Sequence, residues 1–595
     1  MGDEAKQILY YASEGSSNEL EKIIKAHPDW LEQRDHKGRN ALFYAAMTDN
    51  IKTFDLLIKK GMESLAVDSS GASILHWAVQ CGSSKVIKYY MSFGKPGELI
   101  LMKDQDQVTP LHIAATKSNL KTLKMFIEIL TPADDVYRNA QDRRGRSPLH
   151  YAACKANLDA IRALLEIDNN RGDVLGLPVD QKDKKGIIPL MCAVGICLPN
   201  ALPVIRYLAK KKPVSKTRQN ADGHTALHLA VASRNLAAVE LLIGELQCPV
   251  DVIDNDHRTP LHYAAEQGYD ELVTFLLENG ARNSTTDKYG VTPAHYAAQF
   301  SAKCLEILLT RSNIPEVKDN EQRSCFMWAV CSGNINAIHY LIQRKDAPDR
   351  HAVDIRGYSA LHLAAMVGNE HVCKILINQG WNISERDKSN NTALHLAVGR
   401  GHTDVVRFLV TAGANMNERD AVERTPVFWA CLGGQSHTLH CMIKELGFEW
   451  RTGGSAPKPI VDAMDRTPLH AAAFAGFPAC INVLLQIEQE DDCLKAPLVG
   501  WRDQEGKTAL HEACQVGKLD CVISLLKHGA ALNALDNSKR TPLDCALENQ
   551  HKNIIEHLEQ QGALTYKKLK ETAATAIQRY WREKRIRRMK RELAA

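Results

Sequence analysis

The sequence lacks the signals of secretion and of N-terminal lipid attachment. Its first residues have neither a basic segment nor an apolar core, and Lys6 stands where a myristoylation signal has Ser or Thr. None of its 16 cysteines forms a Cys-x-x-Cys pair, the closest two being Cys192 and Cys197. Because disulfide frameworks are typical of much shorter secreted chains, we expect reduced thiols and a cytoplasmic location.

Long apolar runs are also scarce. One stretch, residues 186–205, has twenty residues without a charge, but Pro189, Pro199 and Pro203 interrupt it. A proline-broken segment is a poor membrane span, and this one fits a repeat described below. We therefore expect membrane contact to be at most peripheral.

Positive charge is missing from most of the chain. The 595 residues carry a net charge of +4, but residues 565–595 hold 11 Lys and Arg against 3 Asp and Glu, a net of +8, so residues 1–564 are at −4. A nucleic-acid-binding protein would need its basic surface on the folded body. We expect no nucleic-acid partner.

Catalytic motifs are absent as well. The sequence has no G-x-S-x-G, H-E-x-x-H or protein-kinase pattern. Residues 500–508 resemble a phosphate-binding loop, but five residues separate Gly500 from Gly506 where that loop needs four. The sequence predicts a non-enzymatic protein with no cofactor and no metal site.

What the sequence does contain is a repeated tetrad of the form Thr-Pro-Leu-His. Fifteen copies occur, and their spacing has a base period of 33 residues with longer steps at insertions. Self-similarity at such a period indicates a solenoid of stacked supersecondary units. The tetrads begin at Asn40, Ser73, Thr109, Ser147, Ile188, Thr225, Thr259, Thr292, Ser324, Ser359, Thr392, Thr425, Thr467, Thr508 and Thr541.

Each tetrad has the chemistry of a helix start. Thr or Ser caps free amides, and Pro suits the first helical position because its missing N–H costs nothing there. A second amphipathic helix follows, as in Asp270–Gly280, and Asp-rich turns such as Asp142–Gly145 separate the repeats. This pattern resembles the ankyrin-repeat family. The resemblance implies an all-α solenoid of about sixteen helix-turn-helix repeats with short β-hairpin turns, over residues 1–564, with a divergent first repeat at 1–35.

Histidine is abundant, yet its placement argues against metal binding. Ten of the 23 histidines occupy the last tetrad position. A residue that recurs at the repeat period serves the repeat, and we expect these side chains to bond backbone near the turn between repeats. By the same reasoning we expect small buried side chains at four cysteines that follow their tetrads, namely Cys81, Cys154, Cys431 and Cys514.

Partner binding is expected at the exposed turn tips, because solenoid proteins bind their partners along one extended face. For each tip residue the alternative is a solvated turn side chain without a partner. The partner-binding candidates are Arg143, Arg144, Tyr289, Arg356, Tyr358 and Arg424.

The segment after the repeats, residues 565–595, predicts a basic amphipathic helix. Residues 577–587 resemble the calmodulin-binding IQ motif, with Glu583 in place of the motif's Gly. We predict that this helix binds a calmodulin-like EF-hand protein, and the alternatives are an anionic membrane surface or a solvated tail. The calmodulin-binding candidates are Ile577, Gln578, Trp581, Arg582 and Arg587.

Repeats followed directly by an IQ helix resemble the inversin-like, nephrocystin-type scaffolds. The deviant repeat at Arg323–Ala329 and the closing unit Arg540–Asp544 sharpen the resemblance. It implies a signalling scaffold that binds a NIMA-related kinase and calmodulin, with a cilium- or cytoskeleton-associated location. The chain ends eight residues after Arg587, without that family's long tail. A generic adaptor, such as a ubiquitin-ligase substrate receptor or a phosphatase-targeting subunit, is the alternative.

Overall fold

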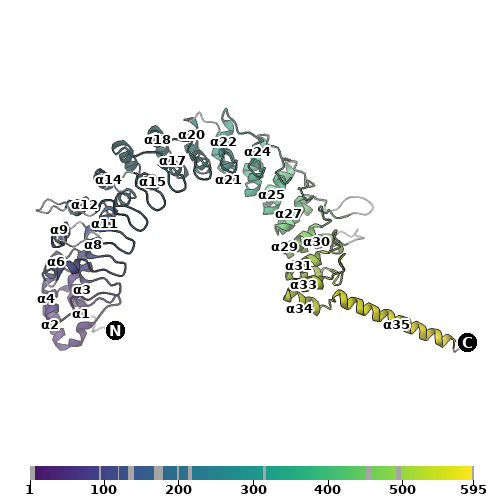
Figure 1. The fold of residues 1–595 in the computed structure, drawn as a ribbon, viewed down its shortest axis with the longest axis horizontal. Helices are drawn as coiled ribbons and strands as arrows, with labels where there is room; N and C mark the ends of the chain where they lie inside the picture. The colour runs from purple at the N-terminus through teal and green to yellow at the C-terminus, as the bar shows by residue number, and fades with distance from the viewer. Residues whose placement is uncertain are drawn as a thin grey trace. The chain divides into compact units, whose positions relative to one another are not determined.

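The computed structural model describes residues 7–92, 95–117, 120–130, 140–166, 178–196, 198, 200–211, 217–311, 317–449, 458–490 and 497–592. These residues form an all-helical protein without β-strands (Figure 1). The chain divides into two compact units, Met1–Pro315 and Glu316–Ala595. Both units are built from successive pairs of short helices, which confirms the predicted fold class.

Unit 1 begins with the divergent repeat, whose helices α1 and α2 lie where the sequence predicted two helices. Its elements are α1 (Gln7–Glu14), α2 (Ser17–Ala26), η1 (Pro28–Glu32), α3 (Ala41–Met47), α4 (Ile51–Lys59), α5 (Ile74–Cys81), α6 (Ser84–Tyr90), α7 (Pro96–Ile100), α8 (Pro110–Thr116), α9 (Leu120–Ile129), α11 (Pro148–Cys154), α12 (Leu158–Leu165), α13 (Pro189–Val194), α14 (Ala201–Lys210), α15 (Ala226–Ala232), α16 (Leu236–Glu240), η2 (Leu241–Glu245), α17 (Pro260–Glu266), α18 (Asp270–Glu278), α19 (Pro293–Phe300) and α20 (Ala302–Thr310).

Unit 2 repeats the same design and ends in one long helix. Its elements are α21 (Cys325–Ser332), α22 (Ile335–Gln343), α23 (Ala360–Val367), α24 (Glu370–Asn378), α25 (Ala393–Arg400), α26 (Thr403–Thr411), α27 (Pro426–Leu432), α28 (Ser436–His440), η3 (Cys441–Glu445), α29 (Pro468–Ala475), α30 (Pro478–Glu490), η4 (Leu498–Gly500), α31 (Ala509–Val516), α32 (Leu519–Lys527), α33 (Pro542–Glu548), α34 (Lys552–Gln560) and α35 (Tyr566–Glu592).

Every predicted tetrad starts a helix. The first tetrad residue is the N-cap in all fifteen cases, from Asn40 before α3 to Thr541 before α33. The Leu of the tetrad and the Ala two residues after the tetrad are buried, as at Leu361 and Ala364 in α23. The first helices thus form the layer in which successive repeats pack on one another.

Nine of the ten tetrad histidines link their repeat to the next one. In all ten, the ring Nδ1 accepts the N-cap amide, at 3.0 to 3.3 Å. In nine of them Nε2 lies 2.9 to 3.3 Å from the carbonyl oxygen of the residue that precedes the next N-cap. Because Nδ1 accepts, Nε2 carries the proton and donates. The structural role predicted for these histidines is confirmed.

The last repeat replaces histidine with Asp544. Its Oδ2 accepts the amide of Thr541 at 2.9 Å, as the histidine ring does elsewhere, and it also accepts the amide of Tyr566 at 2.9 Å. Helix α35 follows α33 and α34 directly, and its start is the partner beyond the cap. Asp544 therefore joins the repeat array to the terminal helix.

The turns between repeats stack without forming a sheet. Within each unit, every turn after the first donates one backbone hydrogen bond to the previous turn, as from Lys388 N to Arg356 O at 3.1 Å and from Ala421 N to Ser389 O at 2.9 Å. Among the described residues, the one isolated bridge joins Val67 and Ser73. The predicted hairpin turns are present, but a single bond per step is too little for strands.

Two of the four cysteines are not buried as expected. Cys431 and Cys514 are buried, whereas Cys154 is half-buried and Cys81 is exposed. The buried pair stands three residues after the last tetrad position, and Cys81 stands five after it. Since a helix turns about 100° per residue, the two spacings place the side chains on different faces.

The uncharged run at 186–205 is divided between two short helices, α13 and α14. Within the part of the chain that the structure describes, no helix has the length and apolar character needed to cross a membrane.

Candidate partner-binding surfaces

An aspartate carboxylate organises most of the turns between repeats, and Asp420 is a buried example. In Asp420, Oδ1 accepts the amides of Val422 and Arg424, both at 2.9 Å. Its Oδ2 accepts Nε of Arg424 at 2.8 Å and the indole N–H of Trp429 at 3.0 Å. Burial opposes ionisation of Asp420, but these hydrogen bonds outweigh it and lower its pKa. The turn, the arginine and the aromatic ring are thereby fixed together.

The same arrangement recurs along both units. Among the described residues, an aspartate bonds the Tyr or Trp nine residues later in seven repeats, so the carboxylate of the turn holds an aromatic side chain of the first helix that follows it. The pairs are Asp35–Tyr44, Asp68–Trp77, Asp142–Tyr151, Asp254–Tyr263, Asp287–Tyr296, Asp319–Trp328 and Asp420–Trp429.

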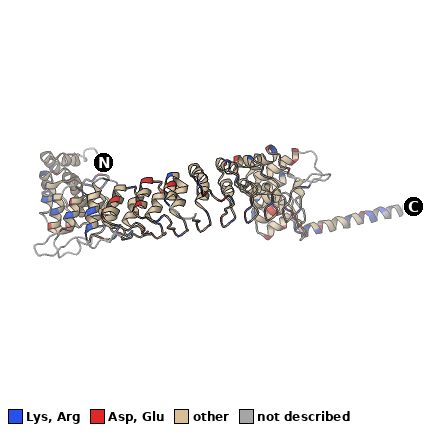
Figure 2. Ribbon diagram, turned by 90° about the horizontal axis from the view of Figure 1, so that it is seen from above, with Lys and Arg blue, Asp and Glu red and all other residues tan. Residues whose placement is uncertain are grey.

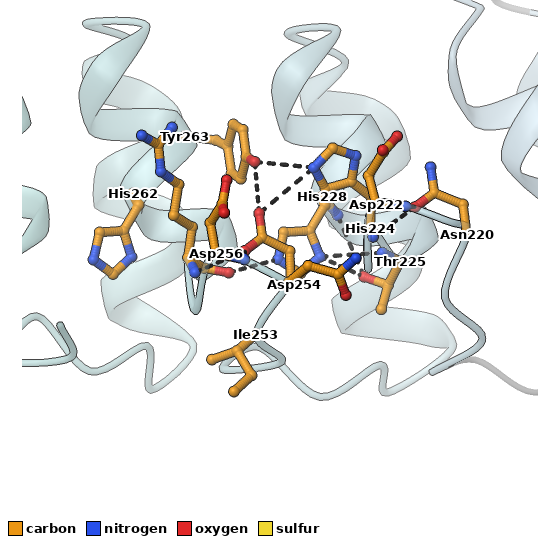
Figure 3. Close-up of polar contacts among 12 residues, drawn as sticks. Asn220, Asp222, His224, Thr225, His228, Ile253, Asp254, Asp256, His262 and Tyr263 are labelled. Carbon is orange, nitrogen blue, oxygen red and sulfur yellow. Dashed lines mark hydrogen bonds and ion pairs between the residues drawn. The ribbon is translucent and has the colours of Figure 1, made fainter. Parts of the chain in front are cut away.

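Figure 3 shows one such junction between α15 and α17. The Tyr263 hydroxyl donates to Asp254 Oδ2 at 2.6 Å and lies 3.0 Å from Nε2 of His224. Asn220 occupies the preceding turn, where its Oδ1 accepts the amides of Asp222 and His224 at 3.0 and 2.8 Å. An amide oxygen is therefore sufficient to close the turn, and the second carboxylate oxygen of Asp254 serves the tyrosine.

Because Oδ1 of Asp254 holds the turn and Oδ2 holds Tyr263, two substitutions of Asp254 are expected to lower the free energy of unfolding by different amounts. Asp254→Asn keeps the turn bonds of Oδ1 to Asp256 N and Arg258 N, at 2.8 and 2.9 Å, and weakens the bond to Tyr263. We expect it to lower the free energy of unfolding by about 1 kcal/mol, and Asp254→Ala by about 3 kcal/mol, because Ala leaves several buried donors unpaired. Urea unfolding followed by circular dichroism measures both, and equal losses would contradict the division of roles.

The unit 1 candidates lie on separate turns. Arg143 and Arg144 are exposed at the tip of one turn. Their backbone serves stacking, since Arg143 N donates to Asp106 O at 2.7 Å and Lys184 N donates to Arg144 O at 2.9 Å. Tyr289 is exposed on another turn, with Lys288 Nζ 4.9 Å from its ring centroid. The structure does not bring these three residues together.

The unit 2 candidates converge on one surface. Arg356, Tyr358 and Arg424 line a pocket of about 360 Å³ between the turns and α23, α25 and α27. A smaller pocket of about 90 Å³ shares the lining residues Arg424 and Leu432 with it. We call the two pockets together the unit 2 groove. Its lining residues are Arg356, Tyr358, Met366, Leu396, Gly399, Arg400, Arg424, Phe428, Trp429, Leu432, Gly433, Asp462, Arg466, His470, Ala471, Phe474 and Glu512.

The helical side of this groove was not predicted from the sequence. Met366, Leu432 and Phe474 each stand at the seventh residue of a first helix, counted from the residue after the N-cap. Aligning the repeats at that position would have shown an apolar row beside the tips. The search for exposed residues at turn tips could not find it.

The terminal helix α35 carries all five calmodulin-binding candidates. Its apolar side chains are exposed, Ile577 by 58% and Trp581 by 60%. Trp581 lies with its ring centroid 5.1 Å from Lys584 Nζ, and Glu583 pairs with Arg579 at 3.3 Å. Figure 2 shows the Lys and Arg residues repeated along this helix. Gln578, Arg582 and Arg587 are also exposed, as is every residue from Lys570 to Arg587.

No cluster of three or more His, Cys, Asp or Glu side chains that could hold a metal ion occurs among the residues with described positions.

Comparison with known proteins gives the family. The model for ankyrin repeats matches residues 8–95, 95–173, 174–248, 190–287, 246–322, 281–352, 326–420 and 490–568. Inversin from Mus musculus is 30% identical over 376 residues, which cover 62% of this chain and 34% of inversin. Inversin from Danio rerio is 32% identical over 423 residues, covering 65% of this chain and 37% of its own length.

Two further similarities are shorter and cover about a third of this chain. The B-cell lymphoma 3 protein homolog of Mus musculus is 34% identical over 185 residues, covering 30% of this chain and 41% of its own length. The crystal structure of the ankyrin repeat domain of Bcl-3 covers 35% of this chain and 95% of its own, at 31% identity and a TM-score of 0.31. The chain thus spans about a third of the inversins it matches. Since the family model covers most of the sequence, the protein belongs to the ankyrin-repeat family, and it is distantly related to inversin.

Proposed function

We propose that the protein is an inversin-like intracellular scaffold that binds one partner along residues 1–564 and a calmodulin-like protein at residues 565–595. The observation that carries this proposal is the coexistence of two unrelated contact surfaces, the unit 2 groove and the exposed basic helix α35. A basic amphipathic helix is the form in which EF-hand proteins take their targets, with apolar anchors in the groove and arginines on its acidic rim.

The calmodulin half is tested with a charge-neutral variant. Ile577→Ala combined with Gln578→Ala removes the apolar anchor and the amide but keeps every charge of α35. We expect its affinity for calmodulin, measured by titration calorimetry with and without calcium, to fall at least about tenfold, which is about 1.4 kcal/mol. The matched control is Thr572→Ala with Thr575→Ala, in the same helix but outside residues 577–587, where binding should persist.

The same variants separate the alternatives for α35. An anionic membrane would bind through the net charge of +8, so both variants would keep binding to phosphatidylserine-containing vesicles. Failure of the unmodified chain to bind calmodulin would contradict this half of the proposal.

For the repeat array, we propose a NIMA-related kinase as the partner and a cilium- or cytoskeleton-associated location. The support for this part of the proposal is the distant relationship to inversin. Proximity labelling with the full chain and with a chain truncated before Lys567 tests it. Recovery of a NIMA-related kinase with both chains supports the proposal. Recovery of ubiquitin-ligase or phosphatase subunits instead would favour a generic adaptor.

A further inference from the structure

We propose that the unit 2 groove binds an extended acidic peptide segment of the partner, with one apolar side chain in the pocket and carboxylates on Arg356 and Arg400. This inference rests on the proposed scaffold function and specifies the chemistry of the partner. It follows from the shape of the pocket and from the distribution of charge around it.

At the seventh helical position, one repeat contributes no side chain to the lining of the pocket. Met366 in α23 and Leu432 in α27 stand at the seventh helical position, where α25 has Gly399. The row of apolar side chains is interrupted there. A Cβ atom at Gly399 would lie 2.8 Å from Cε3 of Trp429, so the indole ring packs directly over the glycine. The pocket is lined by the rings of Tyr358 and Trp429 and by aliphatic side chains, with three arginines beside them.

The charges at the rim are only partly neutralised. Arg424 pairs with Asp420 at 2.8 Å, and Arg466 pairs with Asp462 at 2.8 Å. Arg356 and Arg400 are exposed at the pocket, and among the described residues neither guanidinium has a carboxylate partner. Of the carboxyl groups lining the groove, Asp462 is already paired and Glu512 is buried, which raises its pKa. The pocket therefore offers two guanidinium groups to an anionic ligand.

An acidic peptide fits these features better than a nucleic acid. Residues 1–564 have a net charge of −4, so a long polyanion would meet repulsion beyond the two free arginines. A pocket of about 360 Å³ between apolar side chains suits a Leu- or Phe-sized group, and arginine binds carboxylates with two parallel hydrogen bonds. A short segment with an apolar residue between acidic ones satisfies both requirements.

The test selects ligands without presuming their sequence. The full chain is immobilised and a displayed library of random dodecapeptides is passed over it. We expect the bound pool to be enriched in sequences with one Leu, Met or Phe flanked by Asp or Glu. A fluorescein-labelled peptide of the consensus sequence is then titrated by fluorescence anisotropy. Arg356→Glu with Arg400→Glu should weaken its binding at least about tenfold.

The control is Lys527→Glu, which makes one such charge reversal in the last turn of α32, away from the groove. Like Arg400 it lies at a helix C-terminus, so it matches the helix-dipole cost of Arg400→Glu, and peptide binding should persist. A pool without binders or without acidic enrichment would overturn the inference, as would unchanged binding by the double variant. Partner recovery in proximity labelling that is unaffected by the double variant would leave the scaffold function standing while removing this site.

Discussion

Acidification from pH 7 to pH 5 is expected to lower the thermal unfolding midpoint by more than about 10 °C. The cause is the row of tetrad histidines. Burial lowers the pKa of nine of them, partly offset by the bond from Nε2 to the next repeat. For His112, His262, His395 and His470 the pKa falls to about 4.

Stability falls on acidification because Nδ1 of each histidine would have to take up a proton. In the fold Nδ1 accepts the N-cap amide, so protonation breaks that bond and buries a charge. The unfolded chain, with histidine pKa values near 6.5, binds protons more readily, and stability falls as the pH drops from about 6.5 toward 4. Each fully shifted histidine costs about 2 kcal/mol between pH 7 and pH 5. Aspartates lose their contribution only at lower pH, since hydrogen bonds from Arg39 and Tyr44 outweigh desolvation and lower the pKa of Asp35 to about 2.

A single substitution separates the histidine effect from general acid unfolding. His470→Gln removes one titrating ring that is almost completely buried. We expect the variant to be less stable than the parent at pH 7.5 but to lose less stability between pH 7 and pH 5. Circular dichroism melts at several pH values measure both. A midpoint that stays constant from pH 7 to pH 5 in the parent would contradict the role given to these residues.

The start of each repeat could be predicted from sequence because its determinants are local. Thr or Ser, Pro and the histidine three positions after the cap act within one helical turn, and the histidine's second bond reaches the same place in the next repeat. The one tetrad that starts with Ile188 has no side-chain cap, yet its helix begins at Pro189 as the period requires. Periodicity outweighs the missing cap because the neighbouring helices supply the packing.

The unit 2 groove could not be predicted from the turns alone. Arg356, Tyr358 and Arg424 were identified as tip residues, but their convergence depends on Gly399, Trp429 and the apolar row of the first helices. Those residues are distinguished by what adjacent repeats have at the same position. The sequence of a single repeat does not show how it differs from its neighbours at that position. For α35, the exposed Ile577 and Trp581 agree with a partner-binding helix, and the identity of the partner stays a prediction.

The substitution Gly433→Ala is expected to lower the free energy of unfolding by about 3 kcal/mol, a large effect for one methyl group. Gly433 caps α27 with φ −86°, which any residue can adopt, so backbone strain is not the cause. The cause is contact, because a Cβ atom there would lie 2.3 Å from the carbonyl oxygen of Gly399. Helices α25 and α27 would have to move apart. Urea unfolding of the full chain, with hydrogen exchange at α25 and α27, measures the loss.

Gly244→Ala is the matched control for this prediction. Gly244 also lies in a helical segment, η2, but a Cβ atom there would meet nothing within 4 Å. Alanine should therefore stabilise by about 0.5 kcal/mol, since it restricts the unfolded chain without a clash. Equal effects of the two substitutions would contradict the close approach of α25 and α27. Gly399 also lines the pocket beside Trp429. The separation of α25 and α27 caused by Gly433→Ala should therefore weaken acidic-peptide binding, while calmodulin binding at α35 persists.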